Sequence, residues 1–190
     1  MLSGEFAAYV LISAFSGVVS IIIAYYLGKE LFDRHTGIFA AAFMTFFPSI
    51  VSESTVGFGV HDPFILMMTA IFFFLLFRSL NTINGRRWIE SYTKEDSFLP
   101  DFKSVRTGLR KYASENRQSL TYAMMAGIVV ASIANAWEGF SYLLVIFSMF
   151  YLVQSFIYKF KNRDTLALTS IYAVVGGSLL LFFVPLHEKP

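Results

Sequence analysis

The sequence contains no cysteine, and only 15% of its 190 residues are charged. Without cysteine there is no disulfide framework and no thiolate chemistry, although the redox compartment stays open. An ordinary soluble domain carries about 25% charged residues, so the shortage of charge argues against that class. What the sequence has instead is apolar: 56% of its residues are hydrophobic and 18% are aromatic, and the mean hydropathy is +0.60.

The apolar residues are gathered into runs, several of them about 20 residues long, the length that crosses a ~30 Å hydrocarbon core as a helix. Alternation with a period of two is absent, and only helices or closed barrels satisfy their backbones in lipid. We therefore expect an all-α membrane protein with about six transmembrane helices. The second run is short, and Pro48 near its end indicates a kink or a stop. The predicted segments are 6–28, 37–51, 63–80, 119–136, 139–158 and 165–185.

Positive charge is distributed unevenly around these segments. Every Lys and Arg except Lys189 falls in or beside three connections, between segments one and two, three and four, and five and six. With six crossings these connections lie on one side, and the positive-inside rule makes that side cytoplasmic. We therefore expect a multi-pass integral membrane protein whose two termini, residues 52–62 and the 136–139 turn are external.

One connection, residues 81–118, is large enough to hold structure of its own. Within it, residues 101–117 are predicted to form an amphipathic helix, because Phe102, Val105, Leu109 and Tyr112 share one face. Such a helix either lies on the anionic inner leaflet or packs against the ends of the membrane helices with its basic face in water. Acidic residues interleave with the basic ones, and topology already explains the positive charge, so nucleic acid is not an expected partner. Membrane lipids are.

A polar island, residues 51–63, separates the second and third segments. It carries Glu53 and ends on the pair His61 and Asp62, directly before the third segment. Carboxylate oxygens suit Mg²⁺ or Mn²⁺, and imidazole favours Mn²⁺ or a softer ion. Ionisable groups at membrane depth also mark ion paths. The plainest interpretation is a solvated turn in which Asp62 caps the third helix and Pro63 occupies its first position.

Residues 25–62, YYLGKELFDRHTGIFAAAFMTFFPSIVSESTVGFGVHD, resemble the catalytic subunit family of oligosaccharyltransferases in its archaeal form. Residues 135–144, NAWEGFSYLL, resemble a Trp-Gly type turn of the same family. The resemblance implies a partial C-type glycosyltransferase-like bundle. It also implies transfer of an oligosaccharide from a dolichol-phosphate carrier to an asparagine amide, with a lipid-linked oligosaccharide as substrate.

The family's metal motif, Asp-x-(Asp/Glu/His), binds Mn²⁺ or Mg²⁺ through both of its ends. Aligned through Gly57 and Phe58, its first acid falls on Val60, His61 is the middle residue and Asp62 is the second ligand. Aligned through Gly59 instead, Asp62 becomes the first ligand and Phe64 replaces the second. The resemblance therefore implies Asp62 as a metal ligand, with His61 and Glu53 as weaker candidates. On the same external side, Trp137 and Glu138 are candidates for binding the substrate.

Parts that the family carries before and after this stretch are not in the sequence. We therefore expect a partial protein, working with the rest of a split or larger transferase, and the incomplete motif leaves open whether it catalyses transfer. The alternative is a non-catalytic membrane scaffold, an assembly subunit or a small transporter. No ionisable residue lies in the middle of a predicted segment, which disfavours transport, whereas Gly176 and Gly177 permit close helix packing.

Overall fold

The computed structural model describes residues 4–46, 61–83, 110–160 and 165–187, with side chains described for 11–46, 63–83, 110–160 and 165–183. Six long helices make up this part of the chain, and no strand occurs in it. They are α1 (Gly4–Leu31), α2 (Arg34–Phe46), α4 (His61–Asn81), α6 (Arg117–Ala136), α7 (Phe140–Phe160) and α8 (Leu166–His187).

The described helices confirm an all-α membrane protein. All of them except α2 are long and apolar enough to cross a membrane. A helix suits this environment because it satisfies its own backbone polar groups in lipid. The described part of α2 has 13 residues, which span only about 20 Å at 1.5 Å per residue. It begins at Arg34 rather than at 37, and residues 47–51 of the expected second segment lie outside the described residues.

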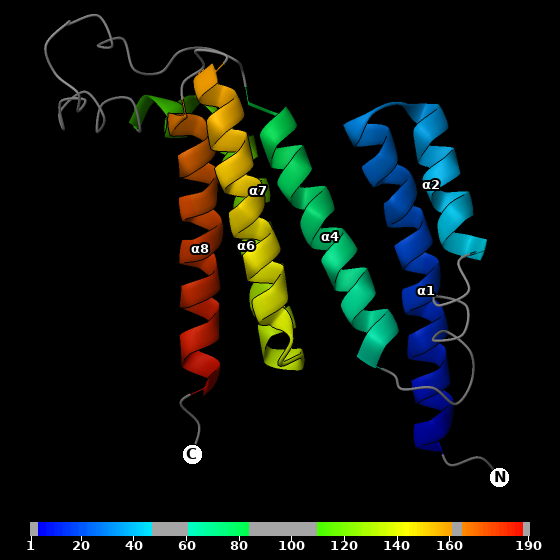
Figure 1. Cartoon of the computed structure of the whole chain (residues 1–190). Coiled ribbons are helices and arrows are strands. Elements are labelled where there is room, and N and C mark those ends of the chain that lie inside the picture. Colours follow the sequence, from blue (N-terminus) through cyan, green and yellow to red (C-terminus); the bar gives the residue numbers. More distant parts are fainter. Residues whose placement is uncertain (1–3, 47–60, 84–109, 161–164, 188–190) are drawn as a thin grey trace, which may run out of the picture.

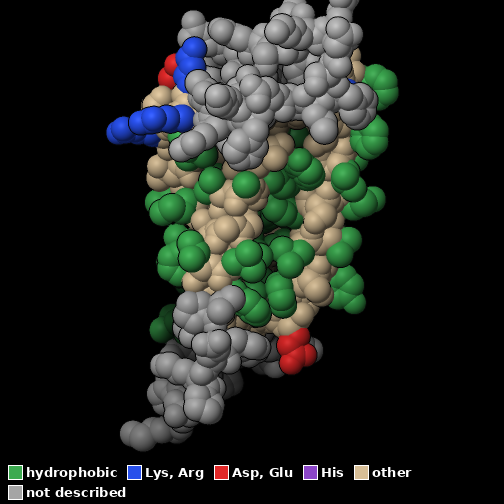
Figure 2. Space-filling view, turned by 90° about the vertical axis from the view of Figure 1, so that its left-hand side faces the viewer, with side chains coloured by type: hydrophobic (Ala, Val, Ile, Leu, Met, Phe, Trp, Pro, Cys, Tyr) green, Lys and Arg blue, Asp and Glu red, His purple; other side chains and the backbone are tan. Residues whose placement is uncertain are grey.

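The helices run alternately up and down (Figure 1). The α1–α2 turn, the end of α4 and the starts of α6 and α8 lie at one end of the bundle. The starts of α1 and α4, the α6–α7 turn and the end of α8 lie at the other. Every Lys and Arg except Lys189 falls in or beside the connections at the end that holds the α1–α2 turn, which we call the basic end. Figure 2 shows hydrophobic side chains over the middle of the molecule, with Lys and Arg side chains gathered near one end.

Close approaches of backbone to backbone hold two pairs of helices. A Cβ atom on Gly37 of α2 would lie 2.6 Å from the carbonyl oxygen of Tyr25 in α1. A Cβ atom on Gly127 of α6 would lie 2.5 Å from Cβ of Ser178 and 2.6 Å from the carbonyl oxygen of Val175, both in α8. Glycine at these positions lets the helices approach, as small residues generally do in membranes.

Helix α4 lies between the α1–α2 pair and the α6–α8 pair (Figure 1). Its Phe72 and Leu76 are fully buried, and they belong to one apolar cluster with residues of α6, α7 and α8. Helix α7 contributes large rings: Phe147 lies 5.5 Å from Phe72 and 4.3 Å from Tyr172 between ring centroids. Most of the remaining surface of α7 is exposed, as expected for a helix that faces lipid.

A capped turn joins α1 to α2. The backbone N–H of Thr36 donates to Oδ1 of Asp33 at 2.7 Å, which satisfies one of the free N–H groups at the start of α2. The pKa of Asp33 is held below its ordinary value, chiefly by hydrogen bonds from the Thr36 side chain and backbone. Arg34 and His35 follow immediately and are exposed, as Asp33 is, so this turn is polar.

Candidate functional site

His61 and Asp62 are the first two residues of α4. The structure describes their backbone and not their side chains. One interpretation of the sequence made Asp62 the cap of this helix, but α4 already begins at His61, so Asp62 lies inside the first turn. A negative charge in a first turn interacts favourably with the partial positive charge of the helix N-terminus. The Pro63 ring, which follows, is buried.

Trp137, Glu138 and Gly139 form the tight turn between α6 and α7. The Trp137 N–H donates to the carbonyl oxygen of Ile133 at 2.9 Å, and the Phe140 N–H donates to the Trp137 carbonyl oxygen at 3.3 Å. The indole ring covers Gly139 so closely that any Cβ atom there would collide with it. Glycine at 139 therefore leaves room for the ring of Trp137. Trp137 is 39% exposed, and the Glu138 side chain is exposed.

The start of α4 and the α6–α7 turn lie at the same end of the bundle, opposite the basic end (Figure 1). This arrangement gathers four of the five predicted site residues at one end of the molecule, while Glu53 lies outside the described residues. Within the described ranges, no group of three or more His, Asp or Glu side chains is placed to hold a metal ion. The structure therefore gathers the backbone positions of His61, Asp62, Trp137 and Glu138 at one end of the bundle.

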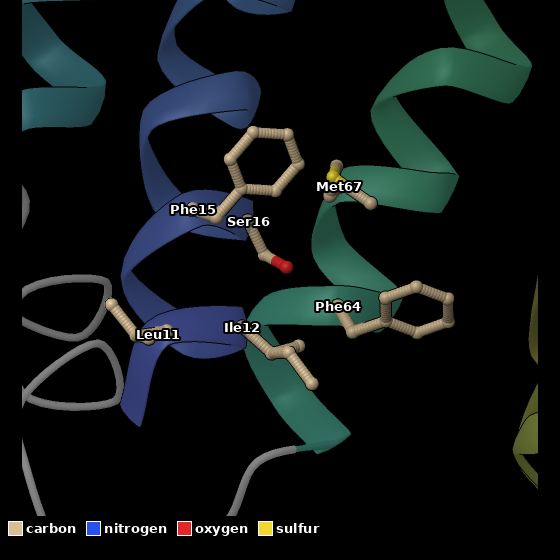
Figure 3. Close-up of a pocket in the computed structure, with 6 residues that line it drawn as sticks. All are labelled: Leu11, Ile12, Phe15, Ser16, Phe64 and Met67. Atoms are coloured by element: carbon tan, nitrogen blue, oxygen red, sulfur yellow. The ribbon is translucent and has the colours of Figure 1, made fainter. Parts of the chain in front are cut away.

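An open apolar groove of about 450 Å³ lies between α1 and α4 (Figure 3). Its walls come from the first half of α1 and the first turns of α4, so it lies toward the His61 end of the bundle. The Ser16 hydroxyl lies at the α4-facing side of α1 among apolar side chains. The lining residues are Leu11, Ile12, Phe15, Ser16, Phe64 and Met67.

An ion pair that sequence analysis missed joins α1 to α4 near the basic end. Arg78 Nη1 lies 2.6 Å from Oε2 of Glu30, and the Asn81 side-chain amide donates to the Glu30 carbonyl oxygen at 3.0 Å. Glu30 is 17% exposed and Arg78 is 43% exposed. The amide thereby satisfies one of the free carbonyl groups at the end of α1. In the sequence Arg78 appears only as part of the positive-inside pattern, and nothing there shows that Glu30 faces it.

Serine residues join α4 to α6 at the same end. The Ser79 and Ser119 hydroxyls each donate to the other residue's carbonyl oxygen at 2.9 Å, and both side chains are fully buried. The Tyr112 hydroxyl lies 3.4 Å from Oγ of Ser119. Tyr112 belongs to a helical stretch, residues 110–115, and is 1% exposed against Leu166 and Ala167. Burial raises the pKa of this phenol, and the Ser119 hydrogen bond opposes that rise.

The described part of the expected 101–117 helix is residues 110–115. Tyr112 is buried among helix ends while Arg110 and Lys111 are exposed. The helical stretch ends at 115, and Asn116 interrupts it before α6 begins at Arg117. Residues 101–109, with the other predicted apolar positions, lie outside the described residues.

The model of the protein family described as "Oligosaccharyl transferase STT3, N-terminal" matches residues 5–189 of the chain. The chain belongs to the oligosaccharyl transferase family. This match covers nearly the whole sequence, so the resemblance drawn from residues 25–62 and 135–144 is confirmed. No curated protein and no solved structure gives a significant match. Membership of the oligosaccharyl transferase family, together with five helices able to span a bilayer, makes the chain an integral membrane protein of a glycosylating family.

Proposed function

We propose that the chain forms part of the membrane domain of an oligosaccharyl transferase and takes part in moving a lipid-linked oligosaccharide to asparagine side chains of proteins. The observation that carries this proposal is the family match over residues 5–189. The position of Asp62 supports it, because the residue lies in the first turn of α4, at the same end of the bundle as Trp137 and Glu138.

Asp62 is the proposed ligand of a divalent cation, Mn²⁺ or Mg²⁺, with His61 and Glu53 as weaker candidates. A carboxylate suits either ion, and an imidazole favours Mn²⁺. A bound cation would supply Lewis-acid character to the phosphate of the carrier lipid. Mg²⁺ keeps several waters and commonly binds through one or two carboxylates plus substrate phosphates, so the two candidate donors at this helix start, His61 and Asp62, fit such a site.

Trp137 and Glu138 are the proposed substrate-facing residues. The indole packs against Gly139 and remains partly exposed, so it offers a flat apolar surface at the level of the membrane interface. Glu138, next to it and exposed, is proposed to approach the carrier phosphate or to serve as a further ligand.

The end of the bundle that carries Asp62 is proposed to face the exterior and the basic end to face the cytoplasm. The support is the sequence of charges: Lys and Arg belong to the connections at one end, and cytoplasmic connections carry this excess. Both termini would then be external.

A metal titration tests the proposal. In detergent or nanodiscs, Mn²⁺ is expected to raise the thermal unfolding temperature of the chain, and Asp62→Ala is expected to abolish that rise. Asp33→Asn is the matched control. It removes a carboxylate at the opposite end of the bundle but keeps the cap of α2, since Asn and Asp cap helices equally well. Mg²⁺ in place of Mn²⁺ would show whether the site prefers one ion.

A non-catalytic scaffold is the second candidate. The observation in its favour is that a Cβ atom on Gly176 or Gly177 would meet nothing within 4 Å, so this part of α8 is open to another helix. If Mn²⁺ leaves the unmutated protein unchanged, or if Asp62→Ala and Asp33→Asn respond alike, the metal-binding proposal fails and the scaffold function takes its place.

A further inference from the structure

Charge at the basic end is gathered in two described regions, and the first of them is largely balanced within the protein. This region is the α1–α2 turn with the end of α4, where three cations lie with two acids: Lys29, Arg34 and Arg78 with Glu30 and Asp33. Glu30 is paired with Arg78, and Asp33 directly precedes Arg34. The acids of this region therefore oppose the approach of a further anion.

The second region, residues 110–117, has a clearer excess of positive charge. Arg110, Lys111 and Arg117 are all exposed, and Glu115 is the one acid in this range. We call the three cations the 110–117 patch. Lys and Arg side chains gathered near one end of the molecule are visible in Figure 2. This region therefore attracts an anionic partner more strongly than the α1–α2 turn does.

Buried contacts hold the 110–117 patch against the ends of the membrane helices. Tyr112 packs against Leu166 and Ala167, and its hydroxyl lies 3.4 Å from Oγ of Ser119. Asn116 is also buried, and its backbone N–H donates to the Tyr112 carbonyl oxygen at 2.9 Å. The apolar spans of α6 and α8 begin beside these residues. The patch is therefore fixed at the level where the hydrocarbon core of a bilayer gives way to its headgroups.

We propose that Arg110, Lys111 and Arg117 bind the headgroups of acidic phospholipids in the leaflet around this end of the bundle. Each side chain can donate charge-assisted hydrogen bonds to phosphate oxygens, and an acidic bilayer surface attracts basic segments beside membrane helices. The partner is a lipid because buried Tyr112 holds the patch at headgroup level. The inference goes beyond the proposed function, since it needs neither a metal nor a glycan carrier and holds in either orientation of the chain.

The positive-inside rule alone leads to a different expectation. It counts Lys29 and Arg34 in the same way as Arg110 and Lys111, because all four are cations at the same end of the bundle. Lipid binding depends instead on cations that neighbouring acids do not balance and that are held at the interface. A comparison of the two pairs therefore separates lipid binding from a signal for orientation.

Energy transfer from the full chain to labelled lipids tests this inference. Because the chain has no cysteine, a donor fluorophore on Ser114→Cys, an exposed position beside the patch, reports on the lipids next to it. Phosphatidylcholine nanodiscs carry the same fraction of either phosphatidylglycerol or phosphatidylcholine with an acceptor on the acyl chain, so both headgroups stay unmodified. Transfer to phosphatidylglycerol is expected to be stronger, and salt is expected to weaken this preference by screening exposed charges.

The matched double variants are Arg110→Gln with Lys111→Gln, and Lys29→Gln with Arg34→Gln. Each removes two exposed cations at the basic end and introduces glutamine, which favours helices nearly as well as lysine and arginine do. The first double variant is expected to lower the preference for phosphatidylglycerol about fivefold for each cation removed. The second is expected to leave that preference unchanged.

Equal transfer to the two lipids would overturn the inference. Equal losses in the two double variants would also overturn it, because they would assign the preference to the overall charge of the basic end. A donor on Ser141→Cys, exposed at the opposite end, is expected to show no preference, and the same preference there would mean that acidic lipid gathers around the whole protein.

Failure of the proposed function is read separately, from the Mn²⁺ response of Asp62 in nanodiscs without acidic lipid. Asp62→Ala is expected to leave the preference for phosphatidylglycerol intact, because it lies at the other end of the bundle. Loss of the lipid preference with an intact Mn²⁺ response therefore removes only this inference.

Discussion

Gly127 is a residue at which one added methyl group is expected to have a large effect. A Cβ atom there would meet Ser178 and the backbone of Val175 at distances that require α8 to move. Gly127→Ala is expected to destabilise the protein by about 1–3 kcal/mol, the usual cost of overpacking. For a chain of this size that lowers the unfolding temperature by about 2–4 °C per kcal/mol.

Gly176→Ala is the control for that change, because the added methyl meets nothing within 4 Å. Alanine is also the better helix former, by about 1 kcal/mol in a helix interior. The control is therefore expected to be neutral or stabilising, and thermal unfolding followed by circular dichroism measures both. Equal effects of the two substitutions would show that α6 and α8 are not in close contact at Gly127.

Contacts of this kind at single residues could not be predicted from the sequence. Gly127 and Gly176 both lie within apolar runs, and only the rotation of each helix about its axis decides which one faces a neighbour. The Ser79–Ser119 pair is separated by 40 positions in the chain, so its pairing depends on how α4 and α6 align. For the same reason, the resemblance points to Asp62 but cannot show where its side chain lies.

At the scale of helices, the Glu30–Arg78 pair joins α1 to α4. Arg78→Met is expected to destabilise the protein by about 1 kcal/mol, the upper end for a partly exposed pair. The reason is that Glu30, only 17% exposed, keeps a charge without its partner. The double variant Glu30→Gln with Arg78→Met is expected to be more stable than Arg78→Met alone, because removing both charges leaves neither unpaired.

Thermal unfolding of the two single variants and the double variant, in the same detergent, measures this coupling. Additive effects would mean that the two side chains do not interact in the membrane. The helices themselves could be predicted from the hydrophobic runs, because these runs lack the alternation of a barrel strand and a helix satisfies its own backbone in lipid. The ends of the helices could not be predicted in the same way. Helix α1 extends past the apolar run to include Lys29 and Glu30, and the described part of α2 is too short to span a membrane.

At the scale of the whole molecule, the absence of cysteine makes its orientation directly measurable. Ser114 and Ser141 are both exposed, one near the basic end and the other beside the α6–α7 turn. In intact cells an impermeant maleimide is expected to label Ser141→Cys, and to label Ser114→Cys only after the membrane is opened. The physical reason is the excess of Lys and Arg at the end that carries Ser114.

These two substitutions keep every charge, so they do not themselves change the signal that sets orientation. Labelling of Ser114→Cys in intact cells, with Ser141→Cys protected, would reverse the proposed topology and place Asp62 on the cytoplasmic side. Which helix ends lie together could be predicted from the charged connections, because consecutive membrane helices run in opposite directions. The packing order of the helices could not, since it depends on contacts between distant segments.

The central place of α4 has a mechanical consequence. Among the described residues, the backbone of α1 approaches α4, that of α2 approaches α1, and neither approaches α6 or α8. Within these described contacts, a tilt of the α1–α2 pair would therefore reach α6 and α8 through α4. Because Asp62 lies in the first turn of α4, such a tilt would also move the proposed metal ligand.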